Sequence, residues 1–203
     1  MKITLLTKFP KEQFYLACSG GPDSMAALSF LVQGRHNFKV AYFHHGTDHG
    51  QKALEFLTDY CETEGLDLVV GRIGGECPKG ESEENYWRNA RYDFFEKLDG
   101  PIVTAHNLDD VVEWWLFTTM HGNPRLIPST RGKVSRPFML TKKKDLQSWC
   151  DTRGVPYVVD PCNKNESYMR PIIRHKIVPQ ALRVNPGLYK VVGKKLRQNL
   201  VQP

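Results

Sequence analysis

A glycine-containing loop lies between two apolar stretches near the start of the chain. Residues 14–18 predict a buried strand, and residues 25–31 predict a helix. The loop that joins them reads Ser19-Gly20-Gly21-Pro22-Asp23-Ser24. A strand, a glycine turn and a helix N-terminus together form an anion site, because backbone N–H groups and the helix dipole both point into the turn. The stretch therefore predicts a phosphate site at the end of a strand.

Each residue type in this loop suits a phosphate chain. Gly20 and Gly21 permit a turn with positive φ and let the backbone approach a phosphate closely. Ser19 and Ser24 add hydroxyl donors, and Asp23 can bind the magnesium ion that accompanies a phosphate chain. No Gly-Lys-Ser/Thr follows, which excludes the P-loop of kinases and GTPases. The structural alternative is an ordinary Gly-Pro-Asp turn in which Ser24 is a helix N-cap.

Length and cysteine content limit the class of protein. The 203 residues suffice for one α/β domain with a small appendage. No apolar run approaches the roughly 20 residues that span a bilayer, and no signal-peptide pattern opens the chain, so we expect a cytoplasmic protein. The odd number and scattered positions of the cysteines argue against a disulfide framework, a zinc ribbon and an iron–sulfur site. They are Cys18, Cys61, Cys77, Cys150 and Cys162.

The net charge of +6 is unevenly distributed along the chain. Residues 1–120 contain 11 Lys and Arg against 18 Asp and Glu, whereas residues 121–203 contain 17 against 4. A one-sided basic region favours a polyanion partner, with RNA as the first candidate and a salt-sensitive protein contact as the alternative. The side chains expected to contact RNA are Arg136, Arg170, Arg174, Lys176, Lys190, Lys194, Lys195 and Arg197.

Residues 38–43 predict a second buried strand, which leads into a histidine-rich stretch. The stretch, His44-His45-Gly46-Thr47-Asp48-His49-Gly50, lacks carboxylates or cysteines at ligand spacing, so a ligand-facing loop is favoured over a metal site. We expect Phe43 and His44 to line a nucleotide site and Asp48 to cap the following helix. Residues 66–70 predict a third strand.

Two arginines lie on a helix that is expected to begin near Ser82. Arg88 and Arg91 are three residues apart and therefore share one face of this helix. From these residues alone, the favoured interpretation is a surface pair that bridges Glu84 or Glu96.

Acidic residues follow a short apolar run at 101–105, which predicts a central parallel strand. The end of this strand places His106 and the start of the next helix at the sheet edge where open α/β folds bind ligands. Helical spacing gathers Asp109, Asp110 and Glu113 on one side, where like charges repel unless a cation or a basic substrate joins them. The alternative is that Asp109 and Asp110 offset the helix dipole, which does not account for Glu113.

The remaining segments complete a doubly wound, mostly parallel five-stranded α/β sheet with helices on both faces and a basic helical C-terminal extension. Residues 124–135 are expected to form a loop, and Thr141 to cap a helix. Residues 155–159 predict a short extended segment. We place the catalytic domain at residues 1–140 and the extension at residues 141–203.

Four blocks in one order resemble the tRNA(Ile)-lysidine synthetase family of the N-type ATP pyrophosphatases (the PP-loop superfamily), which split ATP between the α and β phosphates. The resemblance covers about residues 14–187. The blocks are Ser19–Ser24, Arg88-Asn89-Ala90-Arg91-Tyr92, Thr104–Glu113, and Arg136-Pro137 with Asp160-Pro161-Cys162-Asn163 and Tyr168-Met169-Arg170…Arg174.

This resemblance implies an enzyme that forms a carbon–nitrogen bond. The family adenylates carbon 2 of the wobble cytidine in an isoleucine tRNA, and the amine of lysine then displaces AMP. The implied cofactors are ATP and Mg²⁺, and the implied partners are an isoleucine tRNA and free lysine. A homodimer is left open.

The resemblance also implies roles for individual side chains. The loop binds the pyrophosphate, and Asp23 and Asp109 bind magnesium. Asp109 and Glu113 receive the lysine ammonium group, while Arg91 and Arg88 receive its carboxylate or the developing charge. The implied catalytic residues are Asp23, Arg91, His106, Asp109, Asp110 and Glu113.

The chain departs from the family pattern at several positions. His44-His45-Gly46-Thr47-Asp48 replaces the usual Asn/Asp-His-Gly-Leu-Arg, and Trp114, Cys162 and Pro171 alter other motifs. The additional C-terminal tRNA-binding domains usual in bacterial members are not among these 203 residues. Two alternatives therefore stay open. One is another adenylating pyrophosphatase, such as a tRNA thiolase or an amide ligase, and the other is a catalytically idle RNA- or nucleotide-binding relative.

Overall fold

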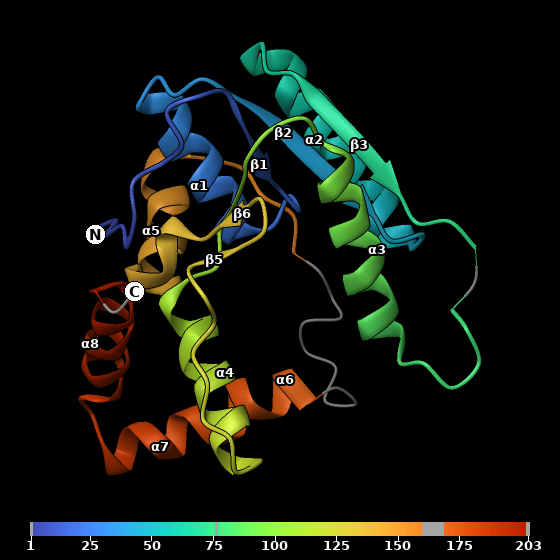
Figure 1. The fold of residues 1–203 in the computed structure, drawn as a ribbon. Helices are drawn as coiled ribbons and strands as arrows, with labels where there is room; N and C mark the ends of the chain where they lie inside the picture. Colours follow the sequence, from blue (N-terminus) through green and yellow to red (C-terminus); the bar gives the residue numbers. More distant parts are fainter. Residues whose placement is uncertain (1, 76, 160–168, 202–203) are drawn as a thin grey trace.

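The computed structural model describes residues 2–75, 77–159 and 169–201. The motif at residues 160–163, which includes Cys162, therefore lies outside the described residues, as does Tyr168. A six-stranded sheet in the order β3-β2-β1-β4-β6-β5 forms the centre of the described part (Figure 1). Its strands are β1 Phe14–Ala17, β2 Phe38–His44, β3 Leu68–Arg72, β4 Ile102–Thr104, β5 Thr130–Arg131 and β6 Val134–Ser135. All pairings are parallel except that of β5 with β6.

Helices connect the strands and continue beyond the sheet. After the first four strands come α1 Pro22–Gln33, α2 Asp48–Glu64, α3 Glu83–Lys97 and α4 Leu108–Met120. A 3₁₀ turn at Pro137–Leu140 leads into α5 Lys143–Arg153. The later segments are α6 Met169–Ile172, a π-helical turn at Ile173–Ile177, α7 Val178–Val184 and α8 Leu188–Val201. No helix in the described ranges is long and apolar enough to cross a membrane.

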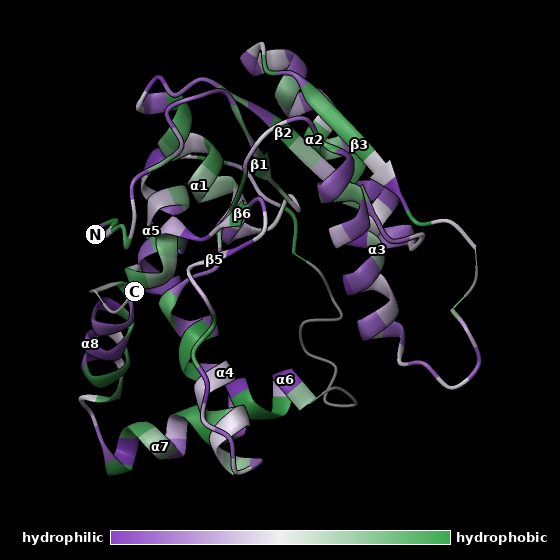
Figure 2. Cartoon of the chain, in the orientation of Figure 1, coloured by the Kyte–Doolittle hydropathy of each residue, from purple (hydrophilic) through white to green (hydrophobic). Residues whose placement is uncertain are grey.

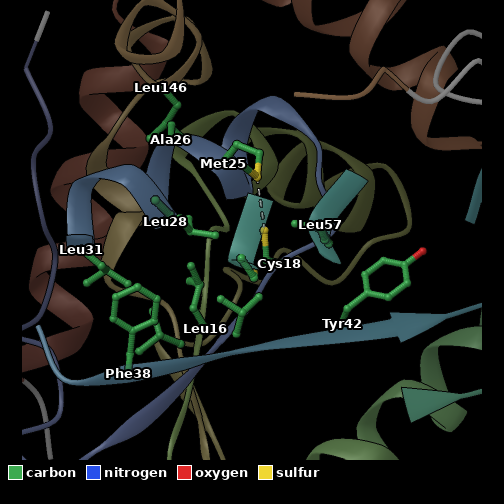
Figure 3. Close-up of a cluster of buried hydrophobic side chains, with 14 of the residues drawn as sticks. Leu16, Cys18, Met25, Ala26, Leu28, Leu31, Phe38, Tyr42, Leu57 and Leu146 are labelled. Carbon is green, nitrogen blue, oxygen red and sulfur yellow. Dashed lines mark hydrogen bonds between the residues drawn. The ribbon is translucent and has the colours of Figure 1, made fainter. Parts of the chain in front are cut away.

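The doubly wound α/β arrangement predicted from the sequence is confirmed, because helices pack on both faces of the sheet. Side chains alternate between the two faces along each strand. Leu16 and Val40 belong to a hydrophobic cluster with α1, α2 and α5, part of which Figure 3 shows. Tyr15 and Ala41 belong to a second cluster with Phe95 of α3. The sheet is therefore buried on both sides, and its strand ends are left to present functional groups.

A third hydrophobic cluster joins α4 to the C-terminal helices, and it includes Val111 of α4 with Val192 and Leu196 of α8. Figure 2 shows hydrophilic and hydrophobic residues mixed along α8. Burial of its apolar residues leaves the neighbouring Lys194 and Lys195 exposed. This cluster fixes the basic extension against the helix that carries the expected catalytic carboxylates. The division of the chain at residue 140 stays a prediction.

The sheet differs from expectation in two places. Residues 130–135, within the expected loop, form the hairpin of β5 and β6, so the sheet has one strand more than the five expected. The segment at 155–159 joins no strand of the sheet. Instead, Val158 N donates a hydrogen bond to Gly20 O at 2.9 Å, so this segment supports the glycine loop from behind.

One helix begins where it was expected, and two helices differ from expectation at their caps. α3 begins next to Ser82 as predicted, and the Ser82 side chain caps it by accepting a hydrogen bond from Asn85 N at 3.3 Å. Thr47 rather than Asp48 caps α2, because Thr47 keeps an extended backbone and Asp48 is already helical. Thr141 does not cap α5 and instead exchanges hydrogen bonds of 2.8 and 2.9 Å with the backbone of Thr4.

A substitution at Gly71 of β3 would show how closely α3 packs on the sheet. A Cβ atom at this position would lie 2.5–2.8 Å from ring atoms of Phe94. We expect Gly71→Ala to lower the free energy of unfolding by roughly 1–3 kcal/mol, because the ring must leave its rotamer. Chemical denaturation measures the change. Gly74→Ala is the control, since a Cβ there meets no atom within 4 Å, and an equal loss in both variants would contradict this packing.

Candidate active site

The loop between β1 and α1 has the geometry of an anion site. Gly20 adopts a positive φ of 78°, Gly21 is the N-cap, and a proline holds the first helical position. Ser24 lies inside the helix, where its hydroxyl accepts from Ser19 N at 3.2 Å and donates to Gly21 O at 2.9 Å. Ser24 is therefore not the N-cap that the ordinary-turn alternative requires. The first N–H groups of α1 face the loop, as at other anion-binding helix N-termini.

Lys143, at the start of α5, joins this loop to the start of α4. Its ammonium group lies 3.3 Å from Asp23 Oδ2, and its backbone N–H donates to Asp109 Oδ2 at 2.7 Å. Tyr189 of α8 donates its hydroxyl to Asp109 Oδ1 at 2.7 Å, so both oxygens of Asp109 are engaged. Lys143 was not predicted from the sequence, because its partners are 120 and 34 residues away and no local pattern marks it.

The buried carboxylate of Asp23 has only one of its two oxygens paired with another described residue. Its Oδ1 is buried and has no hydrogen-bond partner among the described residues. Burial raises the pKa of Asp23 to about 6; Lys143 opposes the increase and Asp110 adds to it. A divalent cation at Oδ1 would relieve this unfavourable burial, so the residue fits the expected magnesium. Within the described ranges no three His, Cys, Asp or Glu side chains gather as a metal site, and magnesium often takes its other ligands from phosphates and water.

A capping box begins α4 directly after β4. Asn107 Oδ1 accepts from the backbone N–H groups of Asp109 and Asp110 at 3.0 and 3.2 Å, and Asp110 Oδ2 accepts from Asn107 N at 2.9 Å. Asp110 thus serves the helix N-terminus, as the dipole interpretation expected, while its Oδ1 lies 3.7 Å from Arg174. The Asn107 Nδ2 atom is buried without a partner in the described part.

Glu113 and Arg174 form a bidentate ion pair. Arg174 Nε and Nη2 donate to the two carboxylate oxygens at 2.6 and 3.0 Å, and Glu113 is only 6% exposed. Burial raises the pKa of Glu113, although Arg174 acts in the opposite direction. Arg174 lies in the π-helical turn, a local distortion that is frequent at functional sites. The RNA contact expected for Arg174 stays a prediction, and in this structure its guanidinium lies among carboxylates.

Arg91 lies in a cluster of cations. It is partly buried and forms no hydrogen bond or ion pair with another described residue, so the expected bridge to Glu96 is absent there. Burial lowers the pKa of its guanidinium; Tyr92 opposes this decrease, and the charges of Arg88 and Arg170 add to it. A partly buried cation among other cations favours an anionic ligand.

Histidines with buried or half-buried rings lie at the ends of β2 and β4. Burial lowers the pKa of both His45 and His106 to about 4, so both rings are neutral at neutral pH. His106 Nδ1 lies 2.7 Å from Thr104 Oγ1. His44 Nε2 and His45 Nδ1 are buried without partners among the described residues. Phe43, expected beside His44 at the nucleotide, is itself buried and packs on His45 with ring centroids 5.0 Å apart.

Arg136 does not take the position expected of an RNA contact. It is 2% exposed, and its guanidinium donates to Pro128 O at 2.7 Å and to Tyr92 Oη at 2.8 Å. The expected RNA contact at Arg136 is therefore wrong, because the side chain supports the chain before β5 from the interior. The other expected RNA contacts are exposed: Arg170, Lys176, Lys190, Lys194, Lys195 and Arg197.

Comparisons with known proteins agree over most of the chain. A family profile described as a PP-loop domain matches residues 2–181. The tRNA(Ile)-lysidine synthase of Methylococcus capsulatus is 30% identical over 190 residues, which are 84% of this chain and 43% of that protein. The tRNA(Ile)-lysidine synthase of Thermosipho africanus is 26% identical over 212 residues, or 91% of this chain and 50% of that protein. The chain thus spans about half the length of these relatives.

A solved structure shares the fold. The U34-tRNA thiolase NcsA from Methanococcus maripaludis, determined with its iron–sulfur cluster, has a TM-score of 0.71 and 16% sequence identity, over 95% of this chain and 73% of that one. This likeness shows a shared fold over most of the chain. Together with the profile match over residues 2–181, these observations show that the chain belongs to the PP-loop domain family.

Proposed function

We propose that this chain is an ATP-dependent ligase that adenylates carbon 2 of a tRNA cytidine and replaces AMP with lysine. A set of buried polar atoms without partners in the described part carries the proposal. Among them, Asp23 Oδ1, His44 Nε2, His45 Nδ1 and Asn107 Nδ2 all follow the carboxyl ends of β1, β2 or β4. Because buried polar atoms are ordinarily hydrogen-bonded, their occurrence along one sheet edge supports a polar ligand there. Open α/β sheets bind nucleotides at this edge.

We assign the phosphates of ATP to the loop between β1 and α1, where a helix N-terminus favours an anion. Magnesium, held by Asp23, would supply the positive charge that offsets the phosphates. Lys143 pairs with Asp23 in this structure and is free to bind a phosphate when Asp23 binds magnesium. Asp109, expected to bind magnesium and lysine, also positions the start of α5, since Lys143 N and Tyr189 each donate to one of its oxygens.

Recognition of free lysine calls for a cation at its carboxylate and acidic groups at its ammonium end. Arg91 suits the first role, because it is partly buried and has no anionic partner among the described residues. Asp110 and Glu113 suit the second role, and we propose that the lysine ammonium group replaces Arg174 at one of these carboxylates. Burial lowers the pKa of His106 to about 4, so the ring is neutral at neutral pH. In the tautomer in which Nδ1–H donates to Thr104 Oγ1, Nε2 can accept a hydrogen bond from the attacking amine.

The resemblance to tRNA(Ile)-lysidine synthases supports an isoleucine tRNA as the substrate, since relatives of that name align with most of this chain. A cytoplasmic location and a homodimer remain predictions from the sequence.

Glu113→Gln tests the selection of lysine. We expect the lysine concentration for half-maximal incorporation to rise roughly tenfold or more, because a charge-assisted hydrogen bond contributes about 1.5–3 kcal/mol, while the ATP requirement changes little. The assay follows tRNA-dependent incorporation of labelled lysine, beside the other amino acids and sulfide. Glu62→Gln, at an exposed position of α2, is the control. Incorporation of sulfide, or indifference to lysine in the parent protein, would instead indicate a tRNA thiolase or an amide ligase.

Asp23→Asn tests the buried carboxylate through pH. The folded pKa of about 6 exceeds the ordinary value of 3.8, so the folded chain binds this proton more tightly than the unfolded chain. Stability from this group is therefore present below about pH 4 and is lost as the pH rises to about 6. Because asparagine never ionises, we expect the melting temperature of the variant, relative to the parent, to be higher at about pH 7.5 than at about pH 4.5. Asp59→Asn, exposed on α2, should show no such difference. The same shift at both pH values would refute the raised pKa.

A further inference from the structure

A groove of about 1160 Å³ lies between α8 and the loop that follows α4. Its apolar lining includes Trp115 of α4 and Pro128 of the loop. Its charged lining consists of Arg125, Lys194, Lys195 and Arg197, and no carboxylate is among the described residues that line it. The groove is thus both hollow and basic, and none of the side chains in the proposed lysine site lines it.

The four cations of this groove are available to a ligand. All are exposed, and none forms a side-chain hydrogen bond or an ion pair with another residue in the described ranges. Lys190, Lys194 and Arg197 follow helical spacing, so they lie along one face of α8. Unpaired like charges held together on a fixed surface raise the local potential and favour a polyanion.

The groove is formed before any ligand binds, because its loop wall is anchored from within. Thr118 Oγ1 accepts from Arg125 N at 2.9 Å and donates to Arg125 O at 3.2 Å. Further along, Pro128 O accepts from the buried guanidinium of Arg136, and Ile127 is buried in the cluster of α4 and α8. Arg136, which was expected from the sequence to contact RNA directly, therefore supports the wall of this groove from the interior.

We infer that this groove binds a single RNA strand, with phosphates on Arg125 and the α8 cations and a base or sugar against Trp115. A basic groove with an aromatic side chain is the combination by which single strands bind without regard to sequence. Glu113 and Trp115 are two residues apart on α4, so their side chains project about 200° apart around the helix. The groove thus lies on the far side of α4 from the reacting carboxylates. The identity of the polyanion as RNA rests on the proposed function.

The test is the salt dependence of binding to unfractionated tRNA and to a single-stranded RNA oligonucleotide, without ATP or lysine. We expect the triple variant Lys194→Glu, Lys195→Glu, Arg197→Glu to bind about tenfold or more weakly and to lower the slope of log affinity against log salt by about 2, or roughly 0.7 per lost phosphate contact. Arg125→Glu, on the opposite wall, should lower the slope by about 0.7. A thermal melt of each variant establishes that it is folded.

The matched control is Lys11→Glu, Lys52→Glu, Lys79→Glu, which makes the same change in net charge at exposed sites outside the groove. The inference is overturned if this control lowers the slope as much as the α8 variant, or if Arg125→Glu and the α8 variant both bind as the parent does. It is also overturned if poly-glutamate and unlabelled RNA of equal charge compete equally well for the bound RNA. Equal competition would mean that the groove suits an acidic protein. Groove-dependent RNA binding without lysine incorporation would refute the ligase and leave the groove standing.

Discussion

The 3.3 Å ion pair between Lys143 and Asp23 is the contact on which the arrangement of the site depends. Through its side chain Lys143 contacts the glycine loop, and through its backbone N–H it contacts Asp109 at the start of α4. Tyr189 then ties the same aspartate to α8. Segments that are far apart in sequence are thereby brought to one sheet edge. Asp23 is left with one engaged oxygen and one oxygen that has no partner among the described residues, the state in which a cation and a phosphate chain can bind together.

Arg174 and Arg91 differ in how their positive charge is balanced by neighbouring side chains, and this difference suggests a different role for each. Arg174, from the basic half of the sequence, pairs with Glu113 and approaches Asp110 in the acidic half. Arg91 is partly buried beside other cations and has no anionic partner among the described residues. The first arginine therefore offsets the negative charge of the acidic side chains, whereas the second is suited to a negatively charged ligand. Four exposed cations that form no ion pair within the described ranges line the groove beside α8: Arg125, Lys194, Lys195 and Arg197.

The parts of the site that follow local patterns were predictable from the sequence, and the parts that depend on distant contacts were not. The strand, loop and helix around Gly20 were predictable because apolar periodicity and glycine mark them locally. The β5–β6 hairpin was missed because its strands have two residues each and show no periodicity. Charge alone could not show that Arg136 is internal, because its partners, Pro128 O and Tyr92, are 8 and 44 residues away. Lys143 was missed for the same reason.

Adenylation of a tRNA base by this chain can be measured as exchange of labelled pyrophosphate into ATP in the presence of unfractionated tRNA. We expect exchange by the parent protein, because adenylation of a base is reversible and releases pyrophosphate. We expect exchange to be lost in Lys143→Ala and retained in Lys144→Ala, which removes an exposed neighbouring lysine. Absence of exchange in the parent protein, or equal exchange in both variants, would refute the proposed roles of ATP and Lys143.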